Sequence, residues 1–114
     1  MAHPVIHAEI RSSDPDATRS FFAELFGWTY SDSGVPGYSF VGTGAEGALP
    51  TAIGAVQDGS DAVLFYVAVD DVEAALARAE ELGGKTIQPA QQVPGASFGV
   101  FADPQGHVVG VAAN

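Results

Sequence analysis

Apolar and polar residues alternate near the start of the chain and then change to a helical spacing. Residues 5–11 alternate strictly, which predicts a half-buried strand. Asp14 and Pro15 are typical of a helix start, and Gly27 is typical of a helix end. Residues 28–56 form short apolar runs broken by glycine and proline, which predicts about three strands. The helical spacing is carried by Phe21, Phe22, Leu25 and Phe26.

The same order of signals returns in the second half of the chain. Val63–Val69 predicts a strand. Asp70 is expected to cap the following helix, with Glu73 completing a capping box and Gly83 ending the helix. Residues 85–114 predict about three further strands, with turns at 93–95 and 103–106. The apolar stripe of this helix is expected at Val72, Ala75, Leu76, Ala79 and Leu82.

The two halves look like copies of one unit. The expected caps, Asp14 and Asp70, have the same separation along the chain as the glycines Gly27 and Gly83. Each half has the order strand, helix and about three strands, so we interpret the chain as an internal duplication of α+β class. The expected single domain covers 4–113, its modules cover about 4–57 and 62–113, and a turn-rich join covers 57–61.

Composition and charge exclude several classes of function. The 114 residues include no cysteine, which excludes a disulfide scaffold, a thiolate metal site and a cysteine nucleophile. The chain has four Lys and Arg and fourteen Asp and Glu, which gives a formal charge of −10. Because nucleic acids and anionic membranes are bound by clustered cations, neither is an expected partner. The start Met1–Pro4 lacks the features of a signal peptide, and we expect a cytoplasmic protein.

Several stretches, in this order and spacing, resemble the vicinal oxygen chelate superfamily, which includes glyoxalase I, extradiol dioxygenases, fosfomycin-resistance enzymes and bleomycin-resistance proteins. The resemblance implies two βαβββ modules whose mixed sheet curls around a cleft, with helices on the outer face. This fold hosts many reactions, so it does not define the chemistry. The matching stretches are Ile6–Ile10, Asp14–Pro15, Phe21–Trp28, Val67–Ala75 and Phe101–His107, where asparagine is commoner than His107.

The metal site of the family is incomplete in this sequence. Metal-dependent members hold one divalent ion with four side chains from four strands, usually His, Glu, His and Glu. The resemblance places His7 at the first position, but residues 51–56 contain no acid or imidazole for the second. The third and fourth positions fall on Leu64 and Gly110, which cannot coordinate. We therefore expect no metal and no cofactor.

The candidate site is the cleft face that the resemblance implies. Alternation places His7 and Glu9 on that face, where they could contact a ligand or form an acid/base pair. The alternatives are that His7 is an inherited metal-ligand position that is now only hydrogen-bonded, and that Glu9 is a solvated acid. The aromatic candidates have core packing as their alternative role. The other strand face, expected to meet the helices, carries Ile6, Ala8, Ile10, Val63, Phe65, Val67 and Val69. The candidate ligand-binding residues are His7, Glu9, Tyr38, Phe40, Leu64, Tyr66, Phe98 and Phe101, and none is assigned as catalytic.

Three functions stay open at this point. The first is a metal-free homodimer that sequesters a small, partly aromatic, neutral or cationic molecule, as bleomycin-resistance proteins do. The second is an enzyme, either a metal-independent lyase or isomerase that uses His7 and Glu9, or a divergent glyoxalase or dioxygenase. The third is a structural or regulatory dimer without catalysis.

Overall fold

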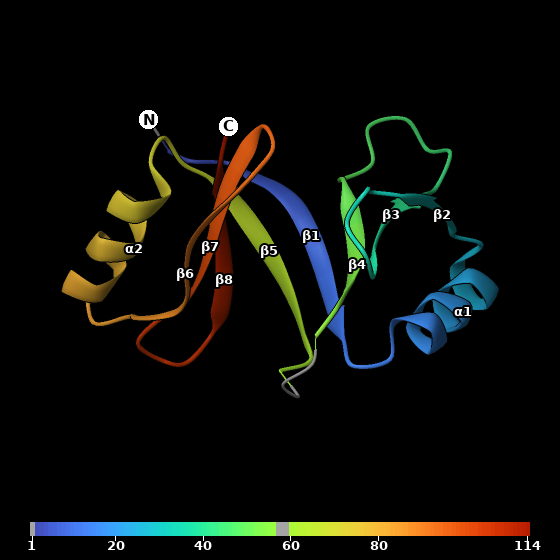
Figure 1. Cartoon of the computed structure of the whole chain (residues 1–114), viewed down its shortest axis with the longest axis horizontal. Helices are drawn as coiled ribbons and strands as arrows, with labels where there is room; N and C mark the ends of the chain where they lie inside the picture. Colours follow the sequence, from blue (N-terminus) through green and yellow to red (C-terminus); the bar gives the residue numbers. More distant parts are fainter. Residues whose placement is uncertain (1, 57–59) are drawn as a thin grey trace. The chain divides into compact units, whose positions relative to one another are not determined.

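The computed structural model describes residues 2–56 and 60–114, so residues 57–59 of the expected join lie outside the described part. Figure 1 follows the chain from blue to red. The elements, in chain order, are β1 (Val5–Ser12), α1 (Pro15–Phe26), β2 (Thr29–Asp32), β3 (Tyr38–Gly42), β4 (Thr51–Ala55), β5 (Ala62–Ala68), α2 (Val72–Glu81), β6 (Lys85–Val93), β7 (Ala96–Ala102) and β8 (Val108–Ala113).

The chain divides into two compact units, one of them His7–Val63 and the other Leu64–Asn114 together with the first residues through Ile6. In the first unit the strands lie in the order β2-β3-β4-β1, where the β1–β4 pair is parallel and the other pairs are antiparallel. In the second unit the order is β5-β8-β7-β6, where β5–β8 is parallel and the other pairs are antiparallel. The equal topology confirms the α+β class and the two βαβββ modules.

The ends of α1 form as the sequence predicts. The Asp14 side chain accepts a hydrogen bond from the Ala17 backbone N–H at 3.1 Å, and Pro15 occupies the first turn, where no N–H is needed. Gly27 takes the left-handed conformation at φ +73°, and its N–H donates to the Ala23 carbonyl. The helix therefore stops where a residue without Cβ allows the chain to turn.

The start of α2 corrects the sequence prediction by a single position. Asp71, not Asp70, is the cap, and its side chain accepts from the Ala74 N–H at 3.1 Å. With Val72 as the first helical residue, Glu73 stands too early in the helix for a capping box, so that prediction is wrong. The separation between the two caps is therefore slightly longer than the sequence predicts.

The two helices bury different amounts of apolar surface. Val72 and Leu76 of α2 are buried against Val111, with Val67 and Val69 packed around them as predicted. By contrast, α1, whose residues are all described, contains no buried residue. The predicted packing of Leu82 is wrong because its side chain is mostly exposed. No helix in the described chain is long and apolar enough to cross a bilayer.

The outer faces of β1 and β5 differ from the prediction. Val63 is 77% exposed, Phe65 is 43% exposed and Ile6 is also exposed, so their expected burial under the helices is wrong. Their neighbours Leu64 and Tyr66 are buried instead. Alternation establishes which side chains share a strand face, but it does not establish which face another element covers.

Candidate functional site

Three polar residues of β1, His7, Glu9 and Arg11, share one face of the first unit. Residues two apart on a strand point the same way, and partnered residues on adjacent strands share a face. The register therefore aligns two rows of side chains across β1, β4 and β3. The first row is Glu9–Ala52–Phe40 and the second is Arg11–Gly54–Tyr38.

His7 is linked to Tyr38 through the space above Gly54. The Tyr38 hydroxyl lies 2.9 Å from His7 Nε2, although β4 separates their strands. A Cβ at Gly54 would lie 2.9 Å from the Tyr38 ring, so only glycine allows the ring to lie across β4 in this way. The rings of Phe40 and Tyr38 pack edge to face at 90°, with their centroids 5.9 Å apart. We call His7, Tyr38 and Phe40 the imidazole–phenol face.

Glu9 is buried and paired with Arg11. The Arg11 Nε donates to Glu9 Oε2 at 2.7 Å, and Glu9 is only 5% exposed. The alternative of a solvated Glu9 is therefore wrong. A buried carboxylate that is bonded to a guanidinium fixes the local geometry, so Glu9 suits a structural role beside the site.

Burial affects the charge state of His7. Removal of the imidazole from water lowers the pKa of His7 below its ordinary value of 6.5, and the Glu9 carboxylate opposes this shift to a smaller extent. At neutral pH His7 is therefore an uncharged imidazole with one donor and one acceptor nitrogen. Such a group hydrogen-bonds a neutral ligand without adding positive charge.

The lowered pKa of His7 predicts a pH-dependent contribution to stability. Unfolding raises this pKa to about 6.5, so the unfolded chain binds the proton first. The contribution is complete well above pH 6.5 and is lost as the pH falls from there through the folded pKa. In an NMR titration we expect the His7 midpoint below 6.5, and we expect His7→Gln to flatten the stability profile there. A midpoint at or above the ordinary histidine value would contradict the burial argument.

The second unit contains a related arrangement without an imidazole. Tyr66 is paired in register with Gly110, and a Cβ at that glycine would lie 2.4 Å from the Tyr66 ring. Leu64 and Phe98 lie on the same strand face as Tyr66, as the registers of β5, β8 and β7 require. Phe101 lies on the opposite face of β7 and packs against the α2 core.

The residues at the metal positions of the family do not fit a metal ion. Within residues 2–56 and 60–114, no three His, Asp or Glu side chains gather closely enough to hold one. At Gly110, the fourth position, an added Cβ would lie 2.4 Å from the ring of Tyr66, so the ring fills the space that a ligand side chain would need. This position therefore holds an aromatic ring in place of a ligating group.

Two contacts in this site, Glu9 with Arg11 and His7 with Tyr38, were not predicted from the sequence. The contact of Arg11 with Glu9 could have been predicted, because a Glu and an Arg two residues apart on a strand share a face. The link from Tyr38 to His7 carried a weaker signal, a glycine inside the β4 strand, which often marks the close approach of another group. Its identity depends on the order of the strands, which the sequence does not state.

Comparison with known proteins places the chain in a family. The model of the glyoxalase-like domain matches residues 7–112. CFP32 of Mycobacterium bovis, a protein named as a candidate glyoxylase, is 32% identical over 111 residues that include 90% of this chain. The anthracycline biosynthesis protein DnrV of Streptomyces peucetius is 33% identical over 118 residues that include 86% of this chain. The chain spans only 42% of the length of each of these relatives.

Solved structures agree on the fold. A glyoxalase/bleomycin resistance protein/dioxygenase superfamily member from Vibrio splendidus matches with a TM-score of 0.65 at 16% identity, over 99% of this chain and 100% of that one. The Mn(II)-bound glyoxalase from Novosphingobium aromaticivorans matches with a TM-score of 0.61 at 19% identity, over 98% of this chain and 40% of that one. With the domain match over 7–112, the chain belongs to the glyoxalase-like domain family of the vicinal oxygen chelate superfamily.

Proposed function

We propose that this glyoxalase-like domain binds a small, partly aromatic molecule at the imidazole–phenol face, without a metal ion. The observation that carries the proposal is the 2.9 Å contact between His7 and Tyr38 beside the exposed ring of Phe40. An exposed aromatic ring next to two polar atoms is typical of small-molecule sites, because the ring gives contact area and the polar atoms give orientation.

The charges around this face favour a neutral or cationic ligand. Arg11, the cation of the same strand face, is engaged by Glu9 at 2.7 Å, and the whole chain carries a formal charge of −10. An anionic ligand would meet an uncharged His7 and a negative protein field. The name of DnrV, an anthracycline biosynthesis protein, supports an aromatic compound as the first ligand to test.

A fluorescence or calorimetric titration with an anthracycline tests the proposal. We expect saturable binding with one site per chain, and we expect Tyr38→Phe to weaken it by about 1–2 kcal/mol because the phenol is lost. Tyr30→Phe is the matched control, since the Tyr30 hydroxyl donates to the Arg19 carbonyl at 2.8 Å, away from this face. Equal affinity of wild type and Tyr38→Phe would contradict the assigned site.

A metal-independent lyase or isomerase is the second candidate function. The observation that favours it is the uncharged His7 in contact with a phenol, because such a pair can take up and return a proton. Glu9 is engaged by Arg11, so Tyr38 replaces it as the expected partner of His7. Incorporation of solvent deuterium beside a carbonyl of a bound compound, lost in His7→Gln, supports catalysis over binding alone.

We also propose that the chain forms a homodimer. Phe21, Leu25 and Phe26 on α1 are each more than half exposed, which is unusual for large apolar side chains gathered on one helix. Light scattering at micromolar concentration is expected to give about twice the 11.7 kDa chain mass. The double variant Phe21→Ser/Phe26→Ser should shift the protein toward the monomer. A single species at the mass of one chain for the wild type would contradict the dimer.

A further inference from the structure

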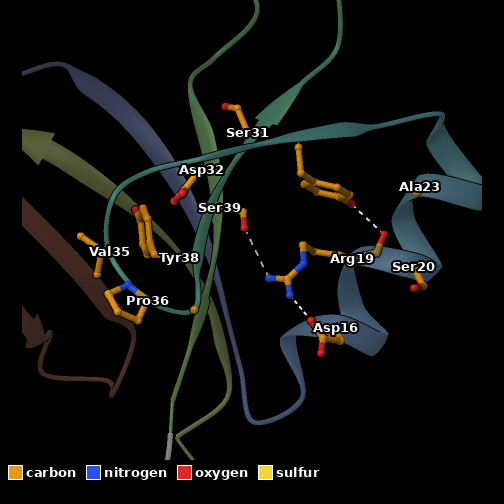
Figure 2. Close-up of a pocket in the computed structure, with 12 residues that line it drawn as sticks. Asp16, Arg19, Ser20, Ala23, Ser31, Asp32, Val35, Pro36, Tyr38 and Ser39 are labelled. Atoms are coloured by element: carbon orange, nitrogen blue, oxygen red, sulfur yellow. Dashed lines mark hydrogen bonds and ion pairs between the residues drawn. The ribbon is translucent and has the colours of Figure 1, made fainter.

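A groove lies between α1 and the β2–β3 hairpin (Figure 2), with both Tyr38 and Ser39 of β3 among its lining residues. Its volume is about 680 Å³, within the range of small-molecule sites. Its helix wall includes Asp16 and Arg19, and its hairpin wall includes Asp32, Val35, Pro36 and Ser39. The groove belongs entirely to the first unit, and it shares Tyr38, but neither His7 nor Phe40, with the imidazole–phenol face.

Arg19 is held in place but keeps donors for a ligand. Its Nη1 contacts Ser39 Oγ at 3.5 Å, and its Nη2 is paired with Asp16. Its backbone carbonyl accepts from the Tyr30 hydroxyl at 2.8 Å, which links α1 to β2. A guanidinium has five N–H donors, so these contacts leave donors for a further acceptor. Its side chain is 21% exposed, so those donors are reachable from the groove.

Asp32 provides the opposite charge on the hairpin wall. One of its carboxylate oxygens, Oδ1, accepts from the Gly34 N–H at 2.9 Å, which fixes the side chain in the turn. Its second oxygen is then oriented by that turn and can accept from a ligand. Asp32 is paired in register with Ser39, so the hydroxyl that contacts Arg19 lies beside this carboxylate.

We propose that this groove binds a small zwitterion of the amino-acid class. The ligand carboxylate accepts from the Arg19 guanidinium, its ammonium group donates to Asp32, and an apolar side chain lies against Val35 and Pro36. A simple anion would be repelled by the carboxylates of Asp16 and Asp32. Among the described residues that line the groove, Arg19 is the one cation that could bind it. A simple amine would leave the Arg19 donors without an acceptor, so a ligand with both charges matches the two walls best.

The ion pair of Asp16 with Arg19 makes a specific prediction for this site. The Asp16 side chain is 91% exposed and lies three residues before Arg19 on the helix, and such pairs contribute little to stability. A ligand carboxylate therefore competes with Asp16 for the guanidinium. Removal of the Asp16 charge should strengthen zwitterion binding, whereas removal of either Arg19 or Asp32 should weaken it.

Calorimetric titration with three related compounds tests the proposal: phenylalanine, 2-phenylethylamine and 3-phenylpropanoate. We expect phenylalanine to bind at least about tenfold more tightly than either compound that lacks one charge. Arg19→Gln and Asp32→Asn should each weaken phenylalanine binding by about tenfold or more, and Asp16→Asn should strengthen it by about threefold. Arg78→Gln is the matched control, because Arg78 forms the same type of exposed helical pair with Glu81 and should change nothing.

The gain expected for Asp16→Asn distinguishes a ligand site from a loss of folding, since an unfolded variant cannot bind more tightly. Absence of phenylalanine binding to the wild type, equal binding of the amine, or unchanged affinity in Arg19→Gln would each overturn the proposal. The His7→Gln variant, changed at a residue of the imidazole–phenol face that does not line the groove, is expected to bind phenylalanine like the wild type. Failure of this groove therefore leaves the proposed function at the imidazole–phenol face untouched.

Discussion

Replacement of Gly110 by alanine is expected to destabilise the protein by about 3 kcal/mol, at the upper end for overpacking by one methyl group. The added Cβ would lie 2.4 Å from the ring of Tyr66, which is only 5% exposed and has little room to move. Gly110 has no positive φ, so the cost comes from the collision and not from backbone strain. Urea denaturation measures the loss directly.

The variant Tyr66→Leu provides the control for this prediction. In that background the shorter side chain leaves space above Gly110, so Gly110→Ala should cost about 1 kcal/mol or less. The coupling between the two positions would then show that the ring is the source of the destabilisation. Equal losses from Gly110→Ala in both backgrounds would contradict the close approach of Tyr66.

Replacement of Arg11 by methionine is expected to destabilise the protein by about 3 kcal/mol. The substitution leaves the carboxylate of Glu9 in the interior without its guanidinium partner, and such a buried charge is costly. Methionine keeps most of the aliphatic volume, so packing changes contribute little to the loss. Thermal and urea unfolding at neutral pH provide the measurement.

The double variant Glu9→Gln/Arg11→Met separates the charge from the packing. Because the amide of glutamine is uncharged, the double variant should be more stable than Arg11→Met alone. Glu9→Gln alone should cost less than Arg11→Met, since the long side chain of Arg11 lets its guanidinium reach water. A double variant that loses the full sum of the two single losses would show that Glu9 and Arg11 act independently.

Local sequence signals predicted the elements because the chemistry that ends a helix is local. Asp14 and Gly27 act through hydrogen bonds to residues three or four positions away, so their roles are readable from the sequence. Asp70 and Asp71 have the same side chain in neighbouring positions, and nothing in the pattern favours the second over the first. The structure selects Asp71 because its side chain reaches the Ala74 N–H.

The candidate site was only partly predictable because it depends on which strands are neighbours. Alternation placed His7 and Glu9 on one face, and the structure agrees. It did not predict that Glu9 is buried with Arg11, or that Tyr38 crosses β4 to meet His7. These contacts follow from the strand order and from the missing side chain at Gly54.

The same limit explains the wrong burial predictions for Val63 and Phe65. Period-two patterning shows that the two side chains share a face, but a helix must lie over that face to bury them. The same discrepancy occurs on helix α1. Phe21 and Leu25 have the spacing of a buried helix face, and yet their side chains are exposed. Burial is a property of the partner surface as well as of the pattern.

Native mass spectrometry tests the central claim, a glyoxalase-like domain that binds a small molecule without a metal ion. The protein is dialysed against Mn²⁺, Ni²⁺ and Zn²⁺, transferred to volatile buffer, and measured with and without an anthracycline. We expect the mass of the polypeptide without stoichiometric metal, and one added anthracycline per chain whose occupancy is reduced in Tyr38→Phe. One tightly held metal ion per chain, with ligand binding that disappears after chelation, would contradict it.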